Sequence, residues 1–547
     1  MRPTDADLRA GIASHATRVE RFRQGSITPD QFRPLRLSYG LYYQLDHTSH
    51  MQRIKLPAGV VTAAQADRLA DITDRWGRGV MHVTTRQDVQ IHWVPLENVI
   101  EMYELLHEVG ITTRGACADS VRNITGCIHA GVRPGEAFDV TPYVMAAHEY
   151  FLFNPLNLTL PRKFKIAFPS CAEDCVQGPI NDIAYYPRIV DGQIGFHVLA
   201  GGGLGAQPFL ARHVRDFLPA ADVLIMSEAI VRVQHRHGER KNRSRARMKY
   251  VVKRFGEERF RNEVEAEFAR VEKECGAELR QELREIVAAY PPDRPARSAA
   301  KAPSGDAAFE RWRRTNVFEQ KQPGFYGVAV QLPLGDVTSD QVRALAALSR
   351  RLGAGVMRAS DDQNLLIPWI SGADLVECRG ALEAIRLATP DALHINDVVS
   401  CPGADYCSLA VSRSMGVAAE IRNHWDMNDL DAEPLGAFRI RISGCPNSCG
   451  QHHVGDIGLT GLTVKGTDGI ERPHYSMLLG GAVGEDGGAL GQRLPGKWPE
   501  GDVPKVIAAL AKFFVEQRQG REPFRTFIQR IGMKTLSDVA HHAGTAH

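Results

Sequence analysis

The sequence predicts an α+β fold in which one arrangement of strands and helices is built twice. An internal repeat of about 276 residues runs through most of the chain. Each half opens with alternating strands and helices, an order typical of a small sandwich of helices on a sheet. The stretch 291–305 is rich in Pro, Ala and charged residues, and we expect it to be an exposed linker between the halves.

Three pairs of segments carry the repeat, and the longest pair shares Gly, Val, Met, Gln, Ile and Trp in register. The paired segments are 79–93 with 355–369, 171–175 with 445–449, and 199–205 with 478–484. A period this long exceeds those of solenoid arrays and indicates a duplicated domain.

The apolar pattern predicts similar elements in both halves. The expected elements are a strand at 51–56, a helix at 63–76 and a strand through Ile91 in the first half, and strands at 328–332 and 365–369 around a helix at 339–352 in the second. A shorter helix is expected at 208–218. The run 438–442 alternates between polar and apolar residues, which predicts a half-buried strand that ends just before Cys445.

Length and charge exclude several classes of protein. At 547 residues the chain is too long for one core, and three or four domains are expected. Its 66 basic and 64 acidic residues give a net charge of +2, which does not indicate a nucleic-acid binder. The sequence shows no signal peptide and no apolar run of membrane-spanning length, so we expect a cytoplasmic protein. Thiols are reduced there, which leaves paired cysteines to metal or redox chemistry.

Four of the ten cysteines form two close pairs. Five residues separate Cys401 from Cys407, and three separate Cys445 from Cys449. Four thiolates suit an iron–sulfur cluster or one zinc ion. Structural zinc usually uses gaps of about two to four residues. The first gap here is longer, and Pro follows the first Cys of each pair, so the spacing favours a cluster and leaves zinc open.

The segment Gly-Cys-Pro-Asn-x-Cys-Gly at 444–450, preceded by Cys-x5-Cys, resembles the cluster segment of the sulfite and nitrite reductases. The resemblance covers nearly the whole chain and is closest to the assimilatory sulfite reductase hemoprotein. It implies an oxidoreductase with one siroheme and one 4Fe-4S cluster between two pseudo-symmetric halves, with Cys449 bridging the cluster and the siroheme iron. We expect one cluster, because no first-half cysteine corresponds to Cys401 or Cys407 at a matching position of the repeat.

The same resemblance implies two ferredoxin-like half-domains and two α/β domains of the siroheme and iron–sulfur type. The expected boundaries are an N-terminal arm (1–46), a first ferredoxin-like half-domain (47–115), a first siroheme-binding domain (116–290), a linker (291–316), a second ferredoxin-like half-domain (317–388) and a 4Fe-4S and siroheme domain (389–547). Without the linker, each half then consists of one domain of each type.

Siroheme carries eight carboxylates, so its pocket should be rich in Arg, whose planar fork pairs with a carboxylate through two hydrogen bonds. The basic run 240–249 by itself indicates a solvated helix face or an RNA-binding patch. Within the family it resembles a segment that faces the macrocycle, as does 85–87. The implied cofactor-binding residues are Arg86, Gln87, Asn123, Arg243, Arg247, Lys249, Asn447 and Cys449, and the implied cluster ligands are Cys401, Cys407, Cys445 and Cys449.

Four cations match the family's anion-binding set, namely Arg53, Arg122, Lys163 and Lys165. Lys163 and Lys165 should share one strand face, where they repel each other unless an anion or solvent lies between them. Family members that reduce nitrite have Asn at the position of Lys165. Since sulfite approaches a dianion near neutral pH and nitrite is a monoanion, a second cation favours sulfite. We therefore expect six-electron reduction of sulfite to sulfide, in sulfur assimilation and cysteine biosynthesis.

The alternatives are an assimilatory nitrite reductase, an oxygenase of a corrinoid precursor and a zinc-stabilised RNA-binding protein. No flavin or nicotinamide motif is present in the sequence, so we expect electrons from ferredoxin or a separate flavoprotein, and no membrane or nucleic-acid partner. Cys171 and Cys175 are interpreted as a duplicated remnant or as ordinary buried thiols. Tyr42 and Tyr43 are candidates for the wall of the substrate pocket.

Overall fold

The computed structural model describes residues 3–544 except 47, 172, 429 and 486. An N-terminal arm of two helices and one strand, α1 (Asp5–Arg23), α2 (Pro29–Ser38) and β1 (Leu41–Tyr43), precedes the duplicated part. Thr4 and Thr28 begin the two helices, each with a capping box that satisfies free backbone amides. No helix in the described part of the chain is long and apolar enough to cross a membrane.

Two five-stranded sheets form the ferredoxin-like parts, in the orders β1-β2-β5-β4-β13 and β11-β12-β15-β14-β3. Their longer strands are β2 (His50–Ile54), β4 (Val80–Val83), β5 (Val89–Val94), β11 (Val317–Glu319), β12 (Phe325–Val330), β14 (Val356–Ala359) and β15 (Leu365–Ser371). The associated helices are α3 (Ala63–Trp76), α4 (Val99–Glu108), α10 (Ser339–Leu352) and α11 (Leu375–Ala384). The predicted α+β fold is confirmed, and α3 and α10 begin and end where the sequence predicts.

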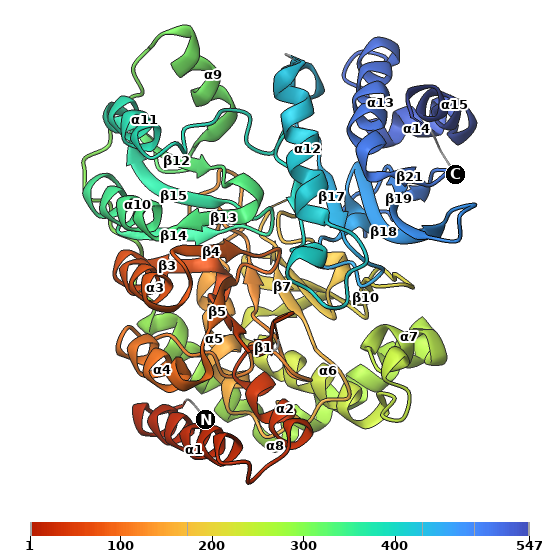
Figure 1. The fold of residues 1–547 in the computed structure, drawn as a ribbon. Helices are drawn as coiled ribbons and strands as arrows, with labels where there is room; N and C mark the ends of the chain where they lie inside the picture. Colours follow the sequence, from red (N-terminus) through yellow and green to blue (C-terminus); the bar gives the residue numbers. More distant parts are fainter. Residues whose placement is uncertain (1–2, 47, 172, 429, 486, 545–547) are drawn as a thin grey trace.

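The two ferredoxin-like sheets exchange their edge strands. β3 (Val60–Thr62), from the first half, pairs with β14, and β13 (Asp336–Thr338), from the second half, pairs with β4. Helices α3 and α10, which follow these strands, pack against each other, and one apolar core runs through both sheets. Each sheet is therefore complete only in the presence of the other half (Figure 1).

Each half also contains a larger domain built on a mixed sheet. The first sheet consists of β6 (Thr125–Gly126), β7 (Ile166–Phe168), β8 (Ile183–Val190), β9 (Gln193–Ala200) and β10 (Arg212–Pro219), with helices α5 (Thr141–Leu152), α6 (Val223–His237), α7 (Met248–Phe255) and α8 (Glu257–Ala289). The second consists of β16 (Val399–Ser400), β17 (Ile440–Ser443), β18 (Ile457–Lys465), β19 (Glu471–Leu479), β20 (Gln492–Arg493) and β21 (Trp498–Pro499), with helices α12 (Ser414–Met427), α13 (Val503–Gln517), α14 (Phe524–Ile531) and α15 (Met533–Ala543). In both sheets the first three strands are parallel and the following ones antiparallel. The two larger domains therefore repeat one topology, each around its own apolar core.

The helix expected at 208–218 is wrong, because most of this segment forms the strand β10. Two bulges in its pairing with β9, on either side of Arg215, shift the register of the strand. The buried residues Val214 and Leu218 consequently lie four positions apart, which is the spacing of a helix.

Two further expectations need correction. β17 is not half-buried but buried throughout, because it lies between its parallel neighbours β16 and β18. Arg441 on this strand is therefore inside the protein, 1% exposed, where it pairs with Asp362. The end of the expected linker forms a helix, α9 (Ala307–Asn316), and Asp293 near its start accepts a hydrogen bond from the Trp369 indole (3.1 Å).

Replacing Arg441 with Met should lower the free energy of unfolding by about 3–5 kcal/mol, because Asp362 would remain buried without its cation. Differential scanning calorimetry would show this as a lower melting temperature. The control is Arg472→Met, which breaks an exposed pair with Asp468 and should cost less than about 1 kcal/mol. Equal melting temperatures for the two variants would contradict the prediction.

Candidate active site

The two cysteine pairs of the second half lie on loops that follow neighbouring parallel strands. Cys401 directly follows β16, and Cys445 comes two residues after β17, as the sequence predicts. The Gly444 amide donates a hydrogen bond to Sγ of Cys401 (3.3 Å). Burial, together with negative charge on Cys449, raises the pKa of Cys401 to about 11. Parallel pairing therefore brings cysteines from distant segments to one edge of the sheet.

The spacing of these four thiols distinguishes a cluster from zinc. Burial raises the pKa of Cys445, and negative charge on Cys449 and Cys407 adds to the shift, so all four cysteines lie in one region. Within the described residues, no three of the four sulfur atoms lie within 4.8 Å of one another. Four thiolates on one zinc ion, at about 2.3 Å each, would be only about 3.8 Å apart. The wider spacing fits a cluster, whose core separates its ligands.

Cys449 is exposed and faces the first half of the chain. The Thr85 hydroxyl, at the end of the β4 segment, donates a hydrogen bond to the Cys449 carbonyl oxygen (2.8 Å), and the Gln451 amide donates to the Thr85 carbonyl oxygen (3.0 Å). Negative charge on Cys449 also opposes the lowering of the pKa of Lys163 and of Lys165. First-half cations and the last cysteine of the second half therefore meet across the interface.

The predicted lysine pair carries no counter-ion. Lys163 and Lys165 flank the buried Phe164 immediately before β7, and alternation turns both side chains to the same side. Burial lowers the pKa of Lys163 to about 8 and that of Lys165 well below its usual value, and neighbouring cations add to both shifts. No carboxylate is among the largest influences on the pKa of either ammonium group. Two such cations side by side form a site for an anion.

Arg53, on β2, belongs to the same group of cations. Its Nε lies 3.9 Å from the Asp88 carboxylate, and its guanidinium stacks over the Tyr42 ring, 5.3 Å from the centroid. Burial alone would lower the pKa of Arg53, but Tyr42, Cys117, Asp88 and Cys449 raise it above the usual value. Arg53 therefore remains charged. The Tyr42 hydroxyl contacts Sγ of Cys117, so this tyrosine lies between Cys117 and Arg53, and its place in the wall of a substrate pocket stays a prediction.

Arg122 forms more hydrogen bonds with the protein than Arg53, Lys163 or Lys165 does. Its Nε and Nη2 donate hydrogen bonds to the Ala118 carbonyl oxygen (3.2 and 3.0 Å), and Nη2 also lies 3.7 Å from Sγ of Cys117. Its charge lowers the pKa of Lys163, so the two cations are neighbours. The four predicted anion-binding residues thus occupy one region, with Arg122 fixed to the loop that carries Cys117.

Lys55 is a buried cation of this region that the sequence analysis did not select. Burial lowers its pKa to about 7, against the opposing charge of Asp88. It lies two positions after Arg53, so alternation along β2 places both on one face. That spacing is the signal that could have identified it. The sequence analysis did not select Asp88 either. Burial raises the pKa of Asp88 to about 6, although the charges of Arg53 and Arg86 oppose this shift.

Three predicted cofactor-binding residues lie beneath the site and bind protein groups. Arg86 donates hydrogen bonds to the Ile166 carbonyl oxygen (2.9 Å) and the Asn123 carbonyl oxygen (3.1 Å), and burial lowers its pKa to about 10. Gln87, in the left-handed region at φ 56°, exchanges two hydrogen bonds with the Gly126 backbone. Asn123 donates to the Leu56 carbonyl oxygen (2.7 Å), whereas its buried side-chain oxygen has no partner among the described residues.

The residues of the basic run 240–249 differ in their exposure to solvent. Arg247 is buried and forms a two-point ion pair with Asp182 (2.8 and 3.3 Å), and Lys249 donates to the Leu204 carbonyl oxygen (2.9 Å) in the glycine-rich run. Burial and Arg247 lower the pKa of Lys249 to about 8. Arg243 is exposed and pairs with Asp119 (2.6 Å). The predicted contacts of these three residues with siroheme stay predictions.

A pair of glutamines joins the two halves beside Cys449. Gln177 and Gln451 occupy corresponding positions of the repeat, both in the left-handed region at φ 55° and 60°. The Gln177 amide donates to the side-chain oxygen of Gln451 (2.6 Å), which also accepts from Arg441 (2.6 Å). The remaining predicted residue, Asn447, is exposed and hydrogen-bonds to Cys445 through its backbone and side chain.

The expectation that the first half lacks a counterpart of Cys401 is wrong. Cys127 follows β6 as Cys401 follows the equivalent strand β16. Each of three first-half cysteines lies 274 positions before its counterpart, and the pairs are Cys127 with Cys401, Cys171 with Cys445, and Cys175 with Cys449. The constant offset of 274 positions is the sequence signal that could have revealed this correspondence. The position that corresponds to Cys407 is occupied by Arg133.

A cluster-binding set of thiols that faces a group of cations defines an oxidoreductase that acts on a small anion. Two family models match the chain. The nitrite and sulphite reductase 4Fe-4S domain matches residues 117–271 and 393–543, and the nitrite/sulfite reductase ferredoxin-like half domain matches 43–109 and 318–385. The chain belongs to the nitrite and sulfite reductase family, whose members carry siroheme and a 4Fe-4S cluster.

Relatives agree with this assignment over most of their length. The assimilatory ferredoxin-dependent nitrite reductase of Haloferax mediterranei is 29% identical over 507 residues, which is 89% of this chain and 83% of the relative. The ferredoxin–nitrite reductase of Synechococcus elongatus is 31% identical over 474 residues, covering 84% and 85% of the two chains. The structure of the Mycobacterium tuberculosis NirA protein superimposes with a TM-score of 0.79 at 26% identity, over 94% of this chain and 92% of that one.

The residues present fit both cofactors. The sulfur atoms of Cys401, Cys407, Cys445 and Cys449 are spaced too widely for a single zinc ion, and Cys449 projects from the cluster region toward the cations. The excess of buried positive charge around Cys449 suits a macrocycle that carries many carboxylates together with an anionic substrate.

Anion binding should weaken as the pH rises through about 8, because Lys163 loses its charge above its lowered pKa. Burial lowers the pKa of Lys165 as well, so proton uptake by this lysine would add to the pH dependence of anion binding. For each lysine that must be protonated when the anion binds, the affinity falls by up to about tenfold per unit rise in pH. Spectral titration of the oxidised protein with nitrite between about pH 6.5 and 9 would measure this. Lys163→Met should flatten the profile above about pH 8, and a flat profile in the unmodified protein would contradict the prediction.

Proposed function

We propose that this protein reduces nitrite to ammonia with electrons from ferredoxin. The observation that carries the proposal is a group of partly buried cations near Cys449, in which Lys163 and Lys165 have no ion-pair partner among the described residues and Arg53 lies beside them. Such a group binds a small anion directly beside a cluster ligand. The names of the relatives support nitrite as that anion and ferredoxin as the donor. The expectation of sulfite as the main substrate has less support from these relatives.

The chain's own residues bind the anion and supply its protons. With the cluster held by Cys401, Cys407, Cys445 and Cys449, the siroheme and the cluster would supply electrons one at a time. Reduction of nitrite to ammonium consumes six electrons and eight protons and releases two water molecules. Arg53 keeps its charge and holds the substrate oxygens, whereas Lys163 has a pKa of about 8 and can donate a proton near neutral pH and recover it. Charge that develops on the departing oxygens is stabilised by the same cations.

Lys55 and Asp88 lie behind these groups and can replenish protons. The pKa of Lys55 is lowered to about 7 and that of Asp88 is raised to about 6, in both cases by burial. Both groups therefore change protonation near neutral pH, and the charge of Asp88 acts on both Lys55 and Arg53. This pair forms a proton reservoir on the side of β2 that faces the cations.

Sulfite is a second candidate because of Lys165. A second cation beside Lys163 favours the substrate of higher charge. Steady-state assays with reduced viologen as electron donor decide between the two anions. We expect nitrite-dependent oxidation with stoichiometric ammonia and a higher kcat/KM for nitrite than for sulfite. A higher value for sulfite would favour the second candidate, and turnover of neither anion would refute the proposal.

Lys165→Asn should shift the ratio of kcat/KM for sulfite to that for nitrite toward nitrite by about tenfold or more, because it removes one positive charge from the anion site. The same viologen assay measures both constants. Lys534→Asn is the control, since this lysine is 91% exposed and pairs only with Asp538. If Lys165→Asn left the ratio unchanged, charge at this position would not determine the choice of anion.

A further inference from the structure

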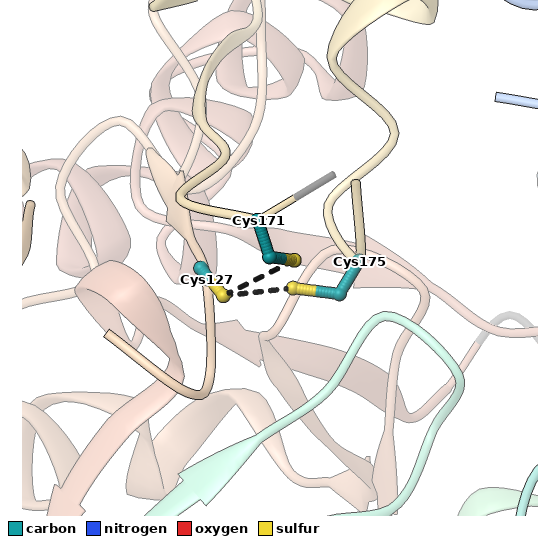
Figure 2. A group of neighbouring side chains, drawn as sticks. All are labelled: Cys127, Cys171 and Cys175. Atoms are coloured by element: carbon teal, nitrogen blue, oxygen red, sulfur yellow. Dashed lines mark hydrogen bonds between the residues drawn. The ribbon is translucent and has the colours of Figure 1, made fainter. Parts of the chain in front are cut away.

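Three thiols of the first half, none of them among the proposed anion-binding or cluster-binding residues, converge at one point. Sγ of Cys127 lies 3.9 Å from Sγ of Cys171 and 3.1 Å from Sγ of Cys175, and all three sulfur atoms lie within 4.8 Å of one another. Figure 2 shows the three side chains pointing toward one centre, Cys127 from the segment after β6 and the other two from one loop. Three thiols that meet in this way form a ligand set rather than a chance contact.

From this geometry we infer that Cys127, Cys171 and Cys175 bind a single thiophilic metal ion, and that the ion is Zn²⁺. Thiolates bound tetrahedrally to zinc at about 2.3 Å have sulfur atoms about 3.8 Å apart. The distance of 3.9 Å between Cys127 and Cys171 is close to this value, and the 3.1 Å between Cys127 and Cys175 is shorter. Binding displaces the thiol protons, and the ion offsets the charge of the three thiolates. This inference does not depend on the proposed function.

The first-half cluster of thiols is closer together than its second-half counterpart, and it lacks a fourth cysteine. Arg133 occupies the position that corresponds to Cys407, and it pairs with Glu173 (2.6 Å). A four-iron cluster normally requires four thiolates. Both differences favour one ion over a second iron–sulfur cluster. The duplicated site has therefore kept three ligands and changed its metal.

His129 is the candidate for the fourth ligand. It lies two residues after Cys127, and its buried Nδ1 has no hydrogen-bond partner among the described residues. Its ring nitrogens are not within 4.8 Å of all three sulfur atoms, so the ring would have to move toward the thiols to complete the ligand set. Its ring packs edge-on against Phe318 at 4.4 Å between centroids. Three cysteines and one histidine are a common ligand set of structural zinc.

The proposed ion would stabilise the loop that joins the two halves. The segment from Cys171 to Gln177 carries the glutamine that contacts Gln451, two residues after Cys449. Cys127 fixes this segment to β6, whose Gly126 is bound by Gln87. An ion at the three thiols would therefore hold the first-half side of the interface in place beside the active site, without taking part in the reaction.

The test is metal analysis of the holoprotein, purified without chelators and incubated with Zn²⁺ before excess metal is removed. We expect one zinc per chain in addition to the iron of the cofactors, and X-ray absorption at the zinc edge should show sulfur ligands at about 2.3 Å. Cys127→Ser and Cys171→Ser should each reduce zinc to less than about a tenth of that value, with iron unchanged. Cys275→Ser is the matched control, because that thiol lies on α8 and contacts only the Val271 carbonyl oxygen (3.6 Å) among its hydrogen-bond partners.

Four outcomes would overturn the inference. They are the absence of zinc from the unmodified protein, zinc that survives both substitutions, iron in place of zinc at the three thiols, and a disulfide between Cys127 and Cys175 in protein kept free of oxygen. The absorption spectrum of the unmodified protein gives a result even if the variants fail to fold. Loss of viologen-linked activity is not part of this test, so the proposed function can fail while the zinc site stands.

Discussion

The reciprocal exchange of β3 and β13 is the constraint on which the rest of the structure depends. Each ferredoxin-like sheet takes its edge strand from the other half, so the two halves have a fixed relation before either larger domain contributes. That relation brings Cys449 of one half opposite Lys163 and Arg53 of the other. A site made from two distant halves requires such a rigid frame, because the first-half cations repel one another and the surrounding structure must hold them together opposite Cys449.

The two halves have the same topology, but they contribute different groups to the site. The second half presents thiols at the ends of its parallel strands, whereas the first half presents cations at the start of the equivalent strand β7. The cluster-binding cysteines therefore lie on one side of the interface, and the anion-binding cations lie on the other. Duplication allowed each copy to keep one part of the site while both kept the scaffold.

Much of the fold could be predicted from the sequence, because helices such as α3 and α10 have clear apolar periods and threonine caps. The paired cysteines and the lysines around Phe164 were likewise visible as short motifs. β10 was missed because bulges gave it a helical spacing, and the burial of β17 depends on neighbours distant in sequence. The group of Cys127 with Cys171 required the third dimension, since the two cysteines lie 44 positions apart.

The contact between Gln177 and Gln451 also bears on the origin of the duplicated chain. A residue on a true twofold axis meets its own copy, so its side chain must complement itself. A primary amide does so, because it carries both a donor and an acceptor, and here one glutamine donates to the oxygen of the other. The same contact would serve a homodimer of half-length chains. Fusion of two such chains would leave this interface intact and free the two copies to diverge.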